Sequence, residues 1–101
     1  MKEEEKNEPS FTELVKYVVS LARSVQDLEI NLNLPISQEQ RQTVLNLIDK
    51  SDARLKQGLI NIIGLGMLDN VRNSIQSNYG NERIGASSIT LLDIYSSNIS
   101  K

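Results

Sequence analysis

Apolar residues in the first third of the chain recur at a helical spacing. From residue 11 the intervals between them alternate between three and four, at Phe11, Leu14, Val18, Leu21, Val25, Leu28 and Leu32. This heptad stripe predicts a long amphipathic helix. Val15 and Ala22 widen the stripe on the side where a two-stranded coiled coil normally carries charge. The wider stripe favours a helix of a bundle over a simple coiled-coil zipper.

Two capping sequences mark where helices begin. Ser10 with Glu13, and Ser37 with Gln40, have the spacing at which a serine hydroxyl and a Glu or Gln side chain bond each other's backbone amides. Between them, Asn31 and Asn33 tolerate turns and Pro35 disfavours helical geometry at the preceding residue, so the first helix should end before Asn31. The sequence therefore predicts one helix that begins after Ser10 and a second that begins after Ser37.

The most apolar stretch, GLINIIGLGML, covers residues 58–68 and contains three glycines. It belongs to a third helical segment that we expect to start near Ala53, after a turn at residues 50–52, although one uninterrupted helix over residues 38–77 stays open. Glycine in such a helix permits close approach of another backbone, a kink or a turn. Its longest apolar run would rise only about 15 Å as a helix, which is too short to span a membrane.

The last segment, residues 88–99, has both helical and strand character. Leu92, Tyr95 and Ile99 fall on one helical face, whereas the Ile, Thr and Tyr content also suits a strand. Because no partner strand is evident, we predict a helix capped by Ser87 or Ser88. The expected fold is thus all-α: a small bundle of three or four helices in one domain over residues 10–101. In it, the long heptad-patterned first helix packs against the apolar third segment.

Composition removes most enzymatic chemistry. The chain has no cysteine and no histidine, so thiol nucleophiles, Ser-His-Asp arrangements and Cys- or His-ligated metals are excluded. The G-x-G at residues 64–66 lacks the third glycine and the nearby cation of a phosphate-binding loop. We therefore predict no catalytic, cofactor-binding or metal-binding residues and a non-enzymatic protein.

Charge is unevenly placed along the chain. The first eight residues carry four Glu and two Lys, and residues 1–9 are predicted to be a disordered charged leader. From Pro9 onward nine acidic residues balance nine basic ones, which disfavours nonspecific binding to nucleic acid. A DNA-binding regulator of helix-turn-helix type remains the alternative. Its candidate contacts are Arg41, Arg54, Lys56 and Gln57, of which the last three lie at the start of the third segment.

Apolar residues that fall off the main stripes suggest a surface for partners. Val19 and Ile30 lie off the first stripe, and Leu65 and Leu68 lie off the stripe of the third segment. A helix that is apolar on nearly every side must be central or covered by another chain. We therefore predict a small interaction or regulatory protein of the cytoplasm that does not associate with membranes. It would form a homodimer and act by occupying the surface of a further, unidentified protein.

Overall fold

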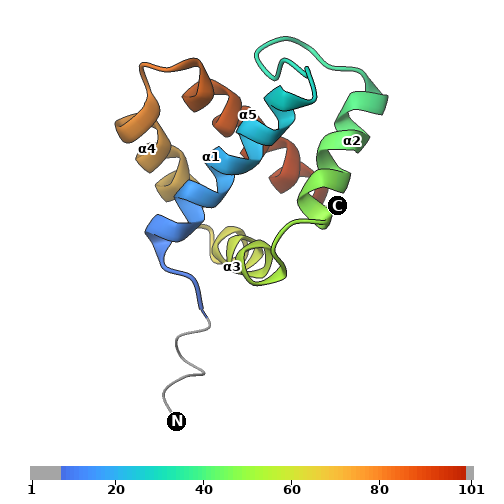
Figure 1. Cartoon of the computed structure of the whole chain (residues 1–101). Coiled ribbons are helices and arrows are strands. Elements are labelled where there is room, and N and C mark those ends of the chain that lie inside the picture. Colours follow the sequence, from blue (N-terminus) through green and yellow to red (C-terminus); the bar gives the residue numbers. More distant parts are fainter. Residues whose placement is uncertain (1–7, 100–101) are drawn as a thin grey trace.

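The computed structural model describes residues 8–99 and, within that range, contains helices and no strand. The five helices are α1 (Phe11–Asp27), α2 (Gln38–Asp49), α3 (Ala53–Gly64), α4 (Leu68–Tyr79) and α5 (Arg83–Ile99). Figure 1 shows α1 in front of α5, with α4 and α2 on either side of this pair and α3 across the end where α1 begins. The all-α prediction is confirmed, but the number of helices is larger than the three or four predicted.

The predicted helix starts are confirmed at both capping boxes. Ser10 Oγ accepts from the Glu13 amide at 3.1 Å, and Glu13 Oε1 accepts from the Ser10 amide at 3.0 Å. Ser37 and Gln40 repeat this arrangement, with both distances 3.1 Å. The predicted turn before the third segment is also present, where Asp52 Oδ1 accepts from the amides of residues 54 and 55. These side chains satisfy amides that have no partner within their helix.

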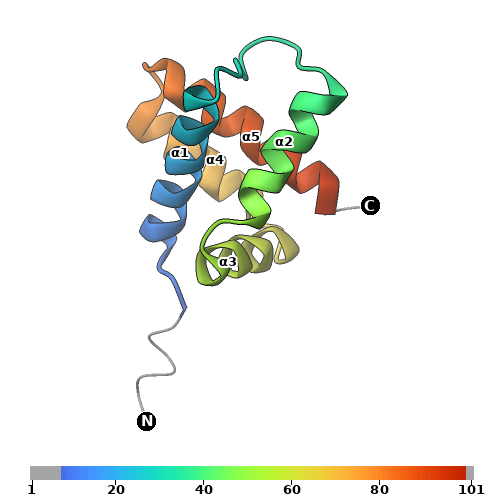
Figure 2. The same ribbon diagram turned by 45° about the vertical axis from the view of Figure 1, so that its right-hand side comes forward.

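The core is shared by all five helices and is centred on α1 and α5. Figure 2 shows that these two longest helices remain neighbours when the molecule is turned. The fully buried side chains include Val18 and Val25 of α1, Val44 and Ile48 of α2, Leu59 of α3, Val71 and Ile75 of α4, and Leu91 and Leu92 of α5. The predicted pairing of the first helix with an apolar third helix is only partly correct, because α3 contacts one end of α1 and contributes a single fully buried residue.

The helix beyond the predicted number is α4, which is separated from α3 by a break at Gly66. The φ of Gly66 is +77°, in the left-handed region that is open to glycine but strained for other residues. The Gly66 amide donates to the Ile63 carbonyl, and the Met67 amide donates to the Ile62 carbonyl, each at 3.0 Å. This pair of bonds is a Schellman motif, which satisfies the last carbonyls of a helix. The apolar stripe at Met67, Val71 and Ile75 therefore belongs to a separate helix instead of continuing α3.

A similar turn ends α1 at Asp27, slightly before the predicted end ahead of Asn31. Glu29 has a φ of +65°, and the Ile30 amide donates back to the Val25 carbonyl at 3.3 Å. The helix ends at Asp27, so Leu28 is half exposed as the C-cap. Leu32 is buried, but it reaches the core from the connection to α2. Within α1 the stripe residues from Leu14 to Val25 are buried, whereas Phe11 before them and Leu28 after them are exposed.

The C-terminal segment is a helix, as predicted, but it is longer than expected. It begins at Arg83, so the predicted caps Ser87 and Ser88 lie inside it and are buried. Ser88 Oγ donates to the Ile84 carbonyl at 2.7 Å, which satisfies the hydroxyl within the helix. The two serines were mistaken for caps because the four preceding residues carry too few large apolar side chains to extend the helical pattern.

Candidate interaction site

An apolar groove lies between α3 and the residues that precede α1. We call it the α3 groove; its volume is 500 Å³ and it is lined by Glu8, Pro9, Leu14, Arg54, Gln57, Gly58, Asn61, Ile62 and Leu65. Its lining residues belong to α3, the start of α1 and the two residues before the Ser10 cap, and Figure 1 shows α3 crossing the end of the molecule where α1 begins. Its walls carry more apolar than polar surface, so covering them would remove apolar surface from water.

Local sequence explains how this groove forms. Pro9 precedes the Ser10 cap, and its ring lies over Gly58 so closely that an added Cβ at residue 58 would be 2.5 Å from Pro9 Cγ. Gly58 is thus the one glycine of the apolar stretch at which another segment packs closely, as the sequence predicted. Pro9 is the last residue of the predicted leader, and in the structure it packs on α3. Residues 1–7 of that leader lie outside the described residues.

Leu65 forms one wall of the α3 groove and projects from it. Its side chain is 73% exposed, more than any other large apolar side chain in residues 8–99. The exposure follows from its position as the C-cap of α3, because the chain reverses at Gly66 and no other element covers this corner. Phe11 and Met67, at the starts of α1 and α4, are also exposed by about a third.

The structure places one of the four predicted interaction residues at the surface. Val19 and Ile30 are 4% and 6% exposed, so both pack in the protein's own core and are closed to a partner. They fall off the heptad stripe, but α1 is covered on more than one side by the surrounding helices. Leu68 is half buried, and only Leu65 of the four remains at the surface. Pro9 and Gly58 were missed, because only tertiary packing brings them together.

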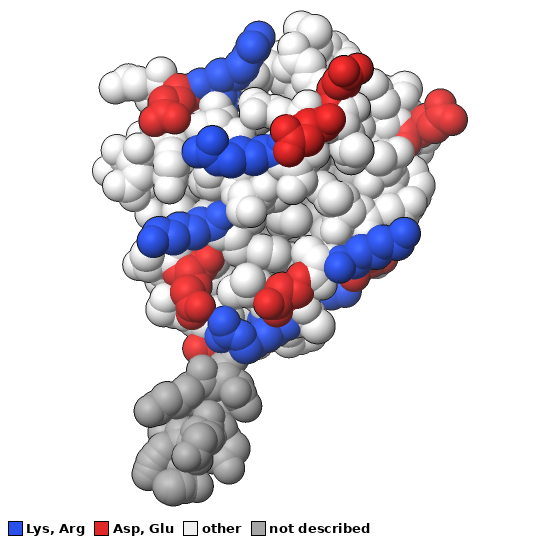
Figure 3. Space-filling view, viewed as in Figure 1, with Lys and Arg blue, Asp and Glu red and all other residues white. Residues whose placement is uncertain are grey.

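The candidate nucleic-acid contacts do not gather into one basic surface. Arg54, Lys56 and Gln57 share the first turns of α3, whereas Arg41 lies on α2 beside a different pocket. Arg54 pairs with Glu13 at 3.0 Å, and Lys56 lies 3.6 Å from Asp49. On the face drawn in Figure 3, Lys and Arg side chains are interspersed with Asp and Glu. This mixing of charges reduces the attraction for phosphates.

The ion pair at the rim of the α3 groove joins α1 to α3. Glu13 Oε1 accepts from the Ser10 amide while its Oε2 accepts from the Arg54 guanidinium. Both interactions favour the charged carboxylate, the amide bond more strongly, and they lower the pKa of Glu13. The carboxylate that completes the α1 cap therefore also contacts the start of α3.

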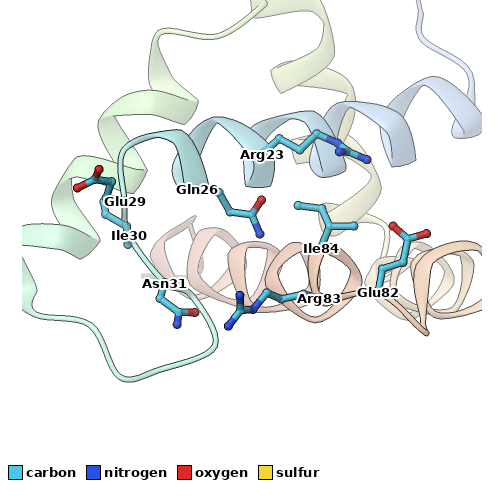
Figure 4. A pocket seen from close by; sticks show the side chains of 8 residues that line it. All are labelled: Arg23, Gln26, Glu29, Ile30, Asn31, Glu82, Arg83 and Ile84. Carbon is cyan, nitrogen blue, oxygen red and sulfur yellow. The ribbon is translucent and has the colours of Figure 1, made fainter.

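A second groove, of 540 Å³, is open and has both polar and apolar walls. Figure 4 shows its lining side chains, which come from the end of α1, the loop that follows it and the start of α5. Two arginines, Arg23 and Arg83, face it together with two carboxylates, Glu29 and Glu82. The opposite charges balance, so this groove offers no net attraction to an anion or a cation.

The hydroxyl groups of Tyr17 and Ser51 bond to each other within the fold. Tyr17 donates to Ser51 Oγ at 2.7 Å, because the Ser51 hydroxyl itself donates to the Ile48 carbonyl. Burial raises the pKa of Tyr17, and it also raises that of Tyr95. Among residues 8–99 no three His, Cys, Asp or Glu side chains are grouped to hold a metal ion.

Comparison with known proteins finds no match for this chain among protein-family models, curated proteins or solved structures. None of the helices in residues 8–99 combines the length and apolar character needed to cross a membrane.

Proposed function

We propose that this protein is a non-enzymatic helical interaction protein that self-associates and acts by occupying a partner's surface. The observation that carries the proposal is the α3 groove with Leu65 projecting beside it. A single exposed leucine is unremarkable, but here it borders a groove walled by Pro9, Leu14 and Ile62. Covering these side chains removes apolar surface from water, which drives association.

Replacing Leu65 with Asp tests this proposal. A carboxylate at this position would have to be desolvated in any interface, so we expect the dissociation constant of the self-associated form to rise at least tenfold. Light scattering and sedimentation over a range of concentrations measure it. Leu34→Asp is the matched control, since Leu34 is 62% exposed but lies in the connection between α1 and α2.

The proposal is overturned if the unaltered chain remains a monomer at every concentration up to millimolar. It is also overturned if Leu34→Asp weakens association as much as Leu65→Asp does. Circular dichroism of both variants checks that helix content is unchanged, as expected for substitutions at exposed positions.

DNA binding by a helix-turn-helix remains the alternative. It is supported by the short turn from α2 to α3, which leaves Arg54, Lys56 and Gln57 in the first turns of the second of these helices. Against it, Arg54 and Lys56 each pair with a carboxylate. If this alternative holds, the chain binds DNA with an affinity that weakens with added salt, and replacing both Arg54 and Lys56 with Glu abolishes the binding. Salt-sensitive DNA binding that survives the double substitution argues against a role for α3 as the recognition helix.

A further inference from the structure

We propose that a groove between α1 and α4 binds a small hydroxycarboxylate, an organic molecule with one carboxylate and several hydroxyl groups. Figures 1 and 2 show these two helices side by side. The groove, which we call the α1–α4 groove, has a volume of 390 Å³ and is lined by Thr12, Val15 and Lys16 of α1 and by Ser74, Asn78 and Tyr79 of α4. It has no lining residue in common with the α3 groove, so this inference does not depend on the proposed function.

The charge of its lining distinguishes the α1–α4 groove. It contains one cation, Lys16, and no carboxylate, whereas the α3 groove, the groove at the end of α1 and two further grooves are each lined by as many acidic as basic side chains. Lys16 forms no ion pair with any group in residues 8–99. Glu13, one turn before it on α1, bonds to Ser10 and Arg54 instead. The lining therefore attracts a single negative charge.

Two hydroxyl groups of the groove have a hydrogen to donate. Ser88 and Thr43 each donate theirs to the carbonyl four residues earlier, a common arrangement within helices. Ser74 Oγ instead accepts from Asn78 Nδ2 at 3.4 Å. Neither the Ser74 nor the Thr12 hydroxyl donates to a group in the described part of the chain. Both can therefore donate to a carboxylate or to a hydroxyl group of a ligand.

The remaining lining suits a hydroxylated carbon chain. Asn78 Nδ2 also donates to the Ser74 carbonyl at 2.9 Å, which leaves the amide oxygen of Asn78 as an acceptor for ligand hydroxyl groups. Val15 is buried and the Tyr79 ring is half buried, so both offer apolar contact to carbon atoms. The volume of 390 Å³ is within the range of small-molecule sites, about 300–1,000 Å³. Because Lys16 is exposed, water weakens its attraction, and we expect a dissociation constant of about millimolar order.

NMR titration with D-gluconate, at constant ionic strength, tests this inference. We expect gluconate to shift the amide signals of residues 12–16 and 74–79. D-sorbitol, which has an alcohol group in place of the carboxylate, should bind about tenfold more weakly or not at all. Lys16→Gln should weaken gluconate binding about tenfold or more, because it removes the only cation of the groove, and Ser74→Ala should weaken it about threefold. Lys50→Gln is the matched control, since Lys50 is also exposed but lines a different groove, together with Asp52.

The outcomes are distinct from those for self-association. Gluconate shifts confined to the α1–α4 groove, lost in Lys16→Gln and kept in Lys50→Gln, support the inference. It is overturned if gluconate shifts none of these amides at about 100 mM, or if sorbitol binds as tightly as gluconate. Equal weakening by Lys16→Gln and Lys50→Gln also overturns it, because the attraction would then be to surface charge in general. Inorganic phosphate that binds about tenfold more tightly than gluconate overturns the assignment to a hydroxycarboxylate.

Discussion

Two glycines at the end of α3 offer a test of the backbone argument with opposite expected signs. Gly64 is the last residue of the helix, whereas Gly66 has a φ of +77° in the turn that follows. An added Cβ would meet nothing within 4 Å at either position. Substitution by alanine therefore changes no packing at these sites, and its effect on stability comes from backbone conformation alone.

The expected magnitudes follow from these conformations. At Gly64, alanine restricts the unfolded chain and keeps a helical backbone, so Gly64→Ala should raise the free energy of unfolding by about 0.5–1 kcal/mol. At Gly66, a Cβ in the left-handed region costs about 1–2 kcal/mol. Alanine also lowers the conformational entropy of the unfolded chain, which offsets part of that cost. Gly66→Ala should therefore lower the free energy of unfolding by about 1 kcal/mol, or roughly 4–8 °C in Tm.

Urea unfolding followed by far-ultraviolet circular dichroism measures both effects, with the unaltered chain as the reference. The midpoints should move in opposite directions while the dependence of the free energy on urea stays the same, because the surface exposed on unfolding is unchanged. The reasoning is refuted if Gly66→Ala is as stable as the unaltered chain, or if Gly64→Ala is destabilised as much as Gly66→Ala.

Two further predictions concern the protein's hydrophobic core and the ion pair at the rim of the α3 groove. Leu59→Ala should lower the free energy of unfolding by about 2–5 kcal/mol, because Leu59 is fully buried. The exposed Leu65 is the comparison, and Leu65→Ala should change the free energy by less than about 0.5 kcal/mol. Equal losses of stability in urea unfolding would contradict the burial of Leu59. The lowered pKa of Glu13 stabilises the fold above pH 4.5, its ordinary value, and this stabilisation is lost as pH falls through the lower folded value. The difference in Tm between the unaltered chain and Glu13→Gln should therefore shrink below pH 4.5, and a difference that grows there would contradict the assigned interactions.

Local signals in the sequence were sufficient to predict where most helices begin. The capping boxes at Ser10 and Ser37 need only residues three positions apart, so their hydrogen bonds form within one turn of chain. The break at Gly66 also has a local signal, a glycine that follows a run of helical residues. The sequence nevertheless left open whether this glycine marks a turn or a site of close packing. The end of α1 was harder to predict, since Glu29 adopts a left-handed conformation that its residue type does not favour.

By itself, then, the sequence determined an all-α chain with helices that start after Ser10 and Ser37, and it excluded cysteine and histidine chemistry. Only the tertiary structure decided which apolar residues remain exposed. Val19 is covered because several helices surround α1, and Leu65 is left at the surface because α3 turns away at a corner. Burial depends on contacts between residues far apart in the chain, such as Pro9 and Gly58. The helical periodicity of the sequence describes only neighbours within one helix, so it does not predict these contacts.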